Sequence, residues 1–479
     1  VAWGAHGALD DRMASGRLSL RPVWELTQPV KDSEAARRLA DQTEFYARTM
    51  HDFNRRTVDY LRQELGVKAL INAGNWKTAN AERLGDAERW SYLPGEVDAV
   101  NHYFGGLHQG VNNGWAIVNG DRFTSDSALR SPHLLPINLK QTQGRPIMVT
   151  ESAWVPPNAY GAEGPFLVAA YTSLTGVAAY HWFATDFQAW TPPRSANGYM
   201  PSLLKWTFAT PETLGSFPAA ALAYRRGDIR TGAPVLVEQR PLAALWQRQS
   251  PRIFEGTGFD PNRDKGDGAR PRNAAATALP PESFLVGPVL ARLGAEAGAT
   301  TTVTDPTPWI TATGIRANTC EIVLDPRKGV ATVDTPRTQG VAAHFAQAPA
   351  HQLSTLGVRS GNAFGAVMAV SLDQQPLADS RSVLLQYATQ SRPTGWQQKP
   401  ATLRLEDGSQ TAGWEVVAHG QAPWQVVQPE LEVSLRNSRL RRATALDMNG
   451  MPLQSVPVKR ADGVFRLRFP PATMYVVLQ

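Results

Sequence analysis

The sequence predicts a mixed chain, in which an α/β region built like part of a (β/α)8 TIM barrel precedes an all-β region. In residues 1–230, short apolar runs alternate with stretches of helical periodicity, which is typical of βαβ units and a parallel sheet. From about residue 309 onward, short β-branched runs recur between turn signals, which is typical of an antiparallel β-sandwich. The first region shows four strands, whereas a closed barrel needs eight. We therefore expect strands five to eight of a barrel, followed by a β-sandwich.

The composition fits a globular chain of two or three domains, since 479 residues, 42% of them hydrophobic, can bury large cores. No run of about 18 apolar residues occurs, so we expect no membrane span. The 48 basic and 42 acidic residues are scattered, so a nucleic-acid partner is not expected despite a net charge of +6. A polyanionic substrate remains open. The single cysteine, Cys320, excludes an internal disulfide and is expected in a buried strand.

A long amphipathic helix is expected over residues 32–65. Apolar side chains recur there at three- and four-residue spacing, and Arg and Asp residues lie between them. Asp32 or Ser33 can cap the N-terminus of this helix, and Gly66 can end it.

Four expected strands all end in polar or aromatic residues. They cover residues 67–73, 97–104, 147–151 and 176–183, and they end near Asn75-Trp76, His102-Tyr103, Glu151 and Trp182, respectively. A (β/α)8 barrel places its catalytic groups at the C-terminal ends of its strands. Glu151 is therefore a candidate catalytic residue, although an isolated Glu at a strand end can equally face solvent.

Two helical stretches and one long loop complete this region. A helix is expected over residues 163–174, and a last helical stretch ends near residue 229. The loop over residues 105–136 is rich in Gly and Asn, and loops of this length in compact domains are usually functional.

The second half of the chain has a different amino-acid composition and a different pattern of apolar residues. Residues 231–308 are rich in Gly, Pro, Ala and Thr, which predicts an irregular connector. Within it, residues 260–268 resemble a calcium loop, but the glycine is misplaced and the final Glu is absent, so we expect a solvated turn, with no metal or cofactor. Residues 309–479 are expected to form an accessory β-sandwich, with strands at 321–324, 329–333, 366–372, 382–387, 431–435, 465–469 and 474–478.

Given these strand ends, residues 1–230 resemble the clan A glycoside hydrolases, a group that includes family 5 cellulases and mannanases and family 42 β-galactosidases. In that clan the nucleophilic Glu ends strand seven, and the matching residue here is Glu151. Strand six commonly ends in a His or Tyr, here His102 and Tyr103, and strand eight ends in a Trp, here Trp182. The resemblance implies a retaining glycoside hydrolase that acts on a plant, algal or microbial polysaccharide or oligosaccharide.

The expected site combines Glu151 with residues that bind sugar. Tyr103 is expected to donate a hydrogen bond to Glu151, which would keep that carboxylate ionised and aimed. The remaining substrate-binding candidates are Asn75, Trp76, His102, Trp154 and Trp182. Simpler interpretations stay open for all of them: each Trp can belong to the core, His102 can be a satisfied buried histidine, and Asn75 can cap a loop.

The sequence departs from the clan at one essential position. The acid/base Glu of the clan usually follows an Asn at the end of strand four, and no Asn-Glu pair occurs here. Glu25 is the only upstream carboxylate that follows a short apolar run, and it lies only a few residues before the long helix. We therefore expect the acid/base residue and the first four strands to be missing from this sequence. The alternative is a non-catalytic carbohydrate-binding protein. A secreted or periplasmic location is expected, although the sequence contains no signal peptide.

Overall fold

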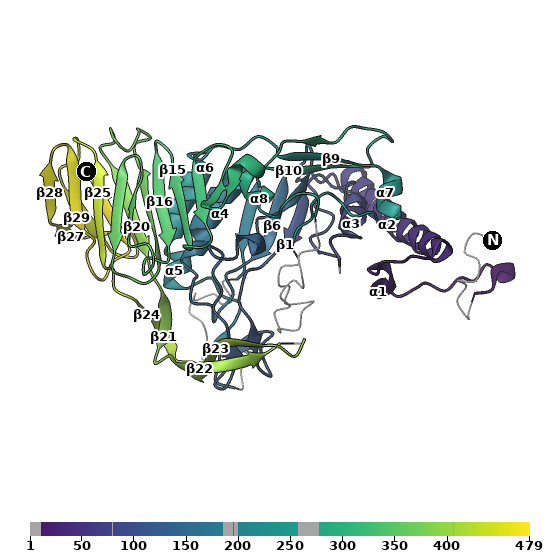
Figure 1. The fold of residues 1–479 in the computed structure, drawn as a ribbon, viewed down its shortest axis with the longest axis horizontal. Coiled ribbons are helices and arrows are strands. Elements are labelled where there is room, and N and C mark those ends of the chain that lie inside the picture. Colours follow the sequence, from purple (N-terminus) through teal and green to yellow (C-terminus); the bar gives the residue numbers. More distant parts are fainter. Residues whose placement is uncertain (1–10, 79, 185–194, 196–199, 257–276, 406) are drawn as a thin grey trace.

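The computed structural model describes residues 11–78, 80–184, 195, 200–256, 277–405 and 407–479. The molecule is elongated, with the N-terminal helices at one end and the C-terminal antiparallel strands at the other (Figure 1). Mixed helices and strands occupy the middle, and a two-stranded arm projects below them (Figure 1). None of the described helices is both long enough and apolar enough to cross a membrane.

The expected long helix is present as α2 (Ser33–Gln63). The Asp32 carboxylate caps it by accepting hydrogen bonds from two backbone N–H groups at 3.0 and 2.8 Å. Gly66 follows in the left-handed region at φ +63°, which lets the chain turn away. The N-terminal part of the apolar face is buried, whereas Met50 and Phe53 are 46% and 57% exposed. Two short helices, α1 (Val23–Leu26) and α3 (Gly85–Ser91), pack against α2.

A parallel sheet holds three of the four expected strands. Its order is β1 (Asp98–Asn101), β6 (Ile147–Ser152) and β7 (Ala179–Trp182). The fourth expected strand, residues 67–73, is not regular; its Asn72 forms a single parallel bridge with Val97, beside β1. The described strands do not close into a barrel, and α4 (Glu163–Thr175) follows β6 as expected.

Helix α4 lies in the centre of the molecule and is buried along its whole length. It packs against α6 (Phe217–Arg225) on one side and against strands of the large C-terminal sheet on another (Figure 1). A helix that is covered on all sides must be apolar nearly all around, which is why its sequence shows little amphipathic contrast. One hydrophobic core joins α4 and α6 to the C-terminal strands, and Tyr180 and Trp182 of β7 pack against it.

The stretch 231–308 was expected to be irregular, and its described part contains regular elements instead. These are β9 (Leu236–Arg240), α7 (Leu242–Trp246), α8 (Ser283–Val286), β10 (Val289–Leu293) and β11 (Thr302–Val303). Strand β10 pairs in parallel with β9 and with β5 (Lys140–Thr142), so this stretch adds a second small sheet to the first region. The calcium-like loop at residues 260–268 lies outside the described residues.

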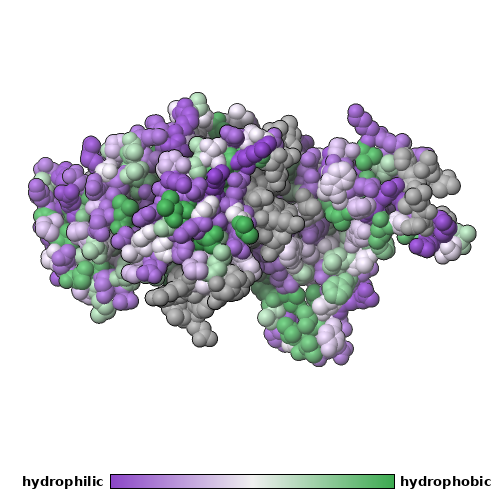
Figure 2. Space-filling view, turned by 90° about the horizontal axis from the view of Figure 1, so that it is seen from below, coloured by the Kyte–Doolittle hydropathy of each residue, from purple (hydrophilic) through white to green (hydrophobic). Residues whose placement is uncertain are grey.

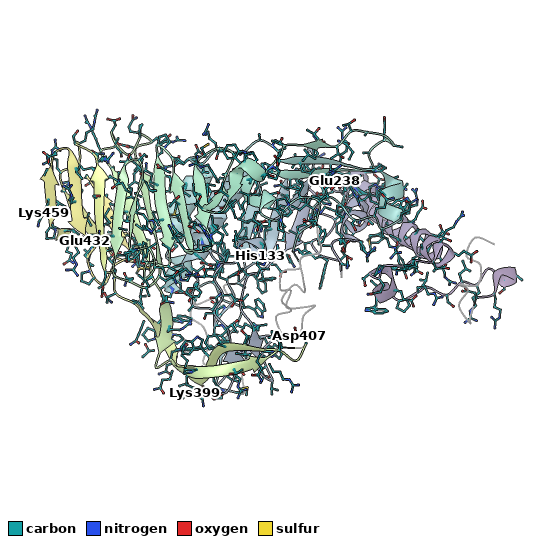
Figure 3. The ribbon with its side chains drawn as sticks, viewed as in Figure 1. His133, Glu238, Lys399, Asp407, Glu432 and Lys459 are labelled. Atoms are coloured by element: carbon teal, nitrogen blue, oxygen red, sulfur yellow. The ribbon has the colours of Figure 1, made fainter. Side chains whose placement is uncertain are left out.

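Buried charged residues explain why the sequence pattern did not predict these strands. Lys140 on β5 and Arg240 on β9 are 1% and 6% exposed, and both form ion pairs with Asp86 of α3, at 2.5 and 2.8 Å. Glu238 is also buried, 3.8 Å from Arg240 (Figure 3). Charged residues in the interior break the apolar run that marks a strand, and they are tolerated because they are paired.

All seven strands expected in the C-terminal region are present, and they belong to two antiparallel sheets. The ten-stranded sheet has the order β12 (Ile310–Thr311), β13 (Gly314–Arg316), β14 (Ile322–Asp325), β15 (Val330–Asp334), β16 (Thr338–Ala343), β19 (Gly365–Ser371), β20 (Val383–Ala388), β30 (Tyr475–Leu478), β26 (Ala443–Leu446) and β27 (Pro452–Val456). The five-stranded sheet has the order β17 (Ala350–Gln352), β18 (Leu356–Ser360), β25 (Leu431–Arg436), β29 (Val464–Arg468) and β28 (Val458–Ala461). The two sheets share one hydrophobic core. Cys320 is exposed in the turn before β14, at φ +63°, so the expectation of a buried strand position was wrong.

The arm in Figure 1 comes from the C-terminal half but pairs with the long loop of the first half. Strands β22 (Gln397–Arg404) and β23 (Gln410–Ala418) form its hairpin, and β23 pairs with β4 (Arg122–Phe123), which pairs with β2 (His108–Gln109). At the base of the arm, β21 (Ser391–Thr394) pairs with β24 (Gln421–Val426). Strand β3 (Ala116–Ile117) pairs with β8 (Leu203–Leu204), and the remaining elements are α5 (Pro211–Leu214), η1 (Met13–Ser15), η2 (Pro132–Leu134) and η3 (Thr307–Trp309).

Candidate functional site

Glu151 and Tyr103 meet at the C-terminal ends of two neighbouring parallel strands. Glu151 is the second-last residue of β6 and is half-buried. Tyr103 lies two residues after the end of β1, and it is 2% exposed. The Tyr103 hydroxyl donates a hydrogen bond to Glu151 Oε2 at 2.5 Å, and the backbone N–H of His102 donates to the carbonyl oxygen of Glu151 at 3.0 Å. The phenol is thus positioned to stabilise negative charge on the carboxylate.

Two further aromatic rings hold Tyr103 in place. The Trp206 ring lies 5.1 Å from the Tyr103 ring and the Phe183 ring lies 6.2 Å from it, both in edge-to-face arrangements. Trp206 is itself fixed, because its Nε1 donates a hydrogen bond to the carbonyl oxygen of Gly114 at 2.7 Å. Neither ring was predicted from the sequence to belong to the site. Phe183 had a signal, since it follows Trp182 at a strand end, whereas Trp206 lies in a segment without periodicity.

Trp182 and Trp154 lie side by side, with ring centroids 5.8 Å apart. Trp182 is half-buried and also contacts Phe217 at 5.5 Å. Trp154 is only 4% exposed and belongs to the central core, and its Nε1 donates to Glu163 Oε1 at 3.2 Å. An indole buried to this extent supports the wall of the site and does not offer a face to a sugar, so the expectation that Trp154 binds substrate does not fit its position.

Glu163 is hydrogen-bonded to Trp154 and to the long loop. It is fully buried in the first turn of α4 and accepts hydrogen bonds from Ser127 Oγ at 2.6 Å and from the backbone N–H of Ala128 at 2.5 Å, in addition to that from Trp154. Burial raises the pKa of Glu163 to about 7, against the opposing effect of these donors. The carboxylate ties the long loop to α4, which is a structural role.

The remaining predicted residues differ in exposure. The carbonyl oxygen of Asn75 accepts from the backbone N–H of Asn101 at 2.9 Å, which places Asn75 beside the end of β1. Trp76 is 56% exposed, so its ring is open to solvent and to a ligand. His102 is 3% exposed, which fits the alternative of a buried histidine. Thr150 Oγ1 donates to Asn101 Oδ1 at 2.8 Å and thereby links the ends of β1 and β6.

The structure does not bring Glu25 together with Glu151. Glu25 lies in α1, within 3.7 Å of Arg21, and both border a small groove between α1 and α2 (Figure 1). Among the residues that the structure describes, no group of three or more His, Cys, Asp and Glu side chains is arranged to hold a metal ion.

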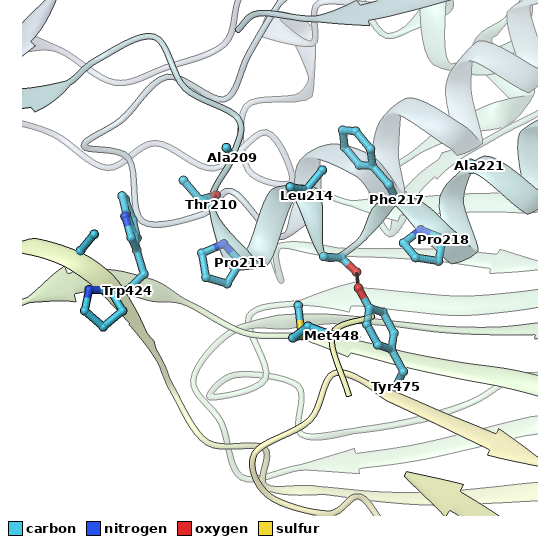
Figure 4. A pocket seen from close by; sticks show the side chains of 13 residues that line it. Ala209, Thr210, Pro211, Leu214, Phe217, Pro218, Ala221, Trp424, Met448 and Tyr475 are labelled. Carbon is cyan, nitrogen blue, oxygen red and sulfur yellow. Dashed lines mark hydrogen bonds between the residues drawn. The ribbon is translucent and has the colours of Figure 1, made fainter. Parts of the chain in front are cut away.

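A pocket of about 940 Å³ opens elsewhere, between α5, α6 and the base of the arm. Its wall is apolar: Phe217, Trp424, Met448 and Tyr475 line it, and Thr210 contributes a hydroxyl (Figure 4). The Tyr475 hydroxyl is already used, because it donates to the carbonyl oxygen of Gly215 at 2.6 Å. A sugar needs several polar partners, so the Glu151 cluster is the better candidate site.

No protein-family model, no curated protein and no solved structure matches this chain.

Proposed function

We propose that this protein is a retaining glycoside hydrolase and that Glu151 is its nucleophile. The observation that carries the proposal is the hydrogen bond from Tyr103 to Glu151 Oε2, formed at the ends of adjacent parallel strands. Tyr103 holds one carboxylate oxygen, which leaves Oε1 to attack. In the first step Oε1 bonds to the anomeric carbon and the bond to the leaving oxygen breaks; in the second, water attacks the same carbon and releases Glu151.

The finer architectural proposal is half of a (β/α)8 barrel. In support, the segment at Asn72, β1, β6 and β7 lie side by side in chain order, all parallel. Asn75, Tyr103, Glu151 and Trp182 all lie at the C-terminal ends of these four segments, which is the active face of such barrels. The C-terminal sheets would be the accessory β-sandwich, since they share a core between them.

Exposed apolar side chains support a further half of the barrel that packs against α2. Met50, Phe53 and Tyr60 of α2 are 46%, 57% and 54% exposed, and Leu70, beside the outer edge of the parallel sheet, is 70% exposed. Met50, Phe53 and Tyr60 share one face of α2 by their spacing, and exposed apolar side chains on one helix face mark a surface that packs against other protein. Such a half would also supply the proton donor for the leaving group.

A mechanism-based inactivator tests the nucleophile without needing the proton donor. In 2,4-dinitrophenyl 2-deoxy-2-fluoroglycosides the leaving group departs without protonation, and the fluorine slows release of the sugar, so a nucleophile becomes glycosylated and stays so. The full 479-residue protein is incubated with a panel of these compounds, and the intact mass and the peptides are measured. We expect one sugar adduct, on the peptide that contains Glu151.

Glu151→Gln is expected to abolish the adduct, and Glu25→Gln serves as the matched control, since it removes a carboxylate that the structure places in α1. Labelling of a different carboxylate, or equal labelling of the Glu151→Gln variant, would overturn the assignment. Binding of oligosaccharides without any adduct across the panel would favour the non-catalytic carbohydrate-binding protein.

A further inference from the structure

The outward face of the five-stranded sheet carries a concentration of basic side chains. Side chains alternate along its strands: Leu431, Val433 and Leu435 of β25 point into the core, so their neighbours point outward. The outward positions hold five exposed basic residues and one exposed acidic residue; these are Arg359, Arg436, Lys459, Arg466, Arg468 and Glu432. We call these six residues the basic face. It lies at the C-terminal end of the molecule, where Figure 3 labels Glu432 and Lys459.

The strand register places these charges in rows across the sheet. Glu432 pairs with Arg359 on one side and with Arg468 on the other. Arg466 is directly opposite Lys459 on the next strand, and strands lie about 4.8 Å apart. Two like charges directly opposite each other on neighbouring strands destabilise a sheet. Folding alone therefore gives no reason for Lys459 and Arg466 to face each other, and such departures from local preference are expected at functional positions.

The basic residues of this face are also free of internal partners. None of the five forms an ion pair or a side-chain hydrogen bond with another residue of the described chain. Other exposed basic residues are engaged: Arg48 pairs with Glu44 at 2.6 Å, and Lys399 pairs with Glu415 at 2.8 Å. The space-filling view shows mostly hydrophilic side chains at this end of the molecule (Figure 2). With five basic residues and one acidic residue, the basic face thus presents a net positive charge to solvent.

We propose that the basic face binds an anionic polysaccharide, one that carries carboxylate or sulfate groups. Four of its five cations are arginines, whose planar guanidinium forms two parallel hydrogen bonds with such groups. The half-exposed Ser434 lies in the same row as Arg466 and Lys459, and its hydroxyl oxygen can accept a hydrogen bond from the sugar. The choice of a polysaccharide rests on the proposed function, in which this face would hold the polymer while Glu151 cleaves it.

A nucleic acid fits this surface less well. Proteins that bind single strands stack bases on aromatic rings, and the outward positions of β18, β25, β28 and β29 carry no Phe, Tyr or Trp. Proteins that read a duplex insert a helix or a β-ribbon into its groove, whereas these strands form one broad face.

The test compares two polymers that differ only in charge. Fluorescein-labelled dextran sulfate and unsulfated dextran of the same length are titrated with the full protein at low salt, and oligothymidylate is titrated alongside. We expect dextran sulfate to bind and dextran not to bind. Lys459→Gln combined with Arg466→Gln should weaken binding of dextran sulfate by about tenfold. Lys31→Gln combined with Arg37→Gln is the matched control, since both residues are exposed at the opposite end of the molecule and the net charge changes equally.

The melting temperature separates binding from folding. Because Lys459 and Arg466 repel each other, their double variant should melt at the same temperature as the parent or slightly higher. Arg359→Gln combined with Arg468→Gln gives a second variant on the same face. Equal binding of dextran and dextran sulfate, an equal loss in the control pair, or tighter binding of oligothymidylate would each overturn the proposal. Labelling of Glu151 is measured separately, so either proposal can fail while the other stands.

Discussion

The hydroxyl of Tyr103 and the carboxylate of Glu151 are joined by a 2.5 Å hydrogen bond that spans two adjacent parallel strands. The two side chains come from positions 48 residues apart in sequence, and the pairing of β1 with β6 brings them together. Tyr103 is rigid, because it is buried against Trp206 and Phe183. A carboxylate held by a fixed donor is oriented before substrate arrives, which is what a nucleophile requires.

Tyr103→Phe should slow glycosylation of Glu151 while leaving the fold intact. The variant keeps the ring that packs against Trp206 and loses only the hydroxyl. Hydrogen bonds to charged groups are worth about 1.5–3 kcal/mol, so the rate of labelling by the fluoroglycoside should fall roughly 10- to 150-fold. Tyr180→Phe is the control, since its hydroxyl bonds to Ser152 rather than to Glu151. If both variants slow labelling equally, the specific role of Tyr103 is wrong.

Trp76 and Trp154 should respond to truncation in opposite ways. Trp154→Ala removes a core side chain that is 4% exposed, and it should destabilise the protein by about 3–5 kcal/mol in urea unfolding. Trp76→Ala removes a ring that is 56% exposed, and it should change stability by less than about 0.5 kcal/mol but weaken oligosaccharide binding. Unchanged binding in the Trp76 variant would remove that residue from the site.

Glu163 should make the protein less stable as pH rises through neutrality. Its pKa is raised from 4.5 to about 7 in the folded state, so the folded state holds its proton more tightly than the unfolded state. The corresponding stability is present below pH 4.5 and is lost as pH rises to about 7, a change of about 3 kcal/mol. Glu163→Gln should abolish this part of the pH dependence.

The measurement is urea unfolding of parent and variant between pH 4 and pH 8. The variant also loses an acceptor for Ser127 and Ala128, so its absolute stability differs from that of the parent. The informative quantity is the difference between the two proteins, which should shift in favour of the variant by about 3 kcal/mol across this range. A constant difference would show that Glu163 does not titrate there.

Protonation of His344 should destabilise the folded protein as the pH falls below neutrality. Burial and the nearby Arg130 lower the pKa of His344 from 6.5 to about 4. Its ring lies 5.0 Å from that of Tyr160 and 5.1 Å from that of Phe364, and its Nε2 is buried with no hydrogen-bond partner in the described chain. The unfolded state therefore binds the proton more tightly, and stability is lost as pH falls from 6.5 towards 4.

His344→Phe keeps a ring between Tyr160 and Phe364 but cannot be protonated, so it should melt with a weaker dependence on acid than the parent. Differential scanning calorimetry at pH 7, 6, 5 and 4 checks this. Parallel decreases in melting temperature for the two proteins would exclude His344 as the group that titrates.

Local sequence patterns were sufficient to predict a helix or strand whose neighbours are close in the chain or that has one apolar face. Helix α2 followed from its periodicity and from the Asp32 cap, and the seven C-terminal strands followed from β-branched runs. The contact of Glu151 with Tyr103 could be predicted because both end apolar runs, and parallel strands present their ends at one edge.

Elements stabilised by buried charge could not be predicted in this way. Strands β5 and β9 contain Lys140 and Arg240, which sequence rules assign to the surface, and their shared partners Asp86 and Glu238 make burial tolerable. The pairing of Trp414 on β23 with Phe123 on β4 joins segments from opposite halves of the chain, and no local pattern specifies such a contact.

The sequence by itself determined where α2 and the seven C-terminal strands form, and it placed Glu151 and Tyr103 at strand ends, because hydrogen bonding and side-chain periodicity act over a few residues. The tertiary structure decided which side chains are accessible. Trp76 and Trp154 are the same residue type beside the same sheet, yet one is open to a ligand and the other is enclosed by α4. Burial depends on what packs over a residue from distant parts of the chain, and only the folded molecule fixes that.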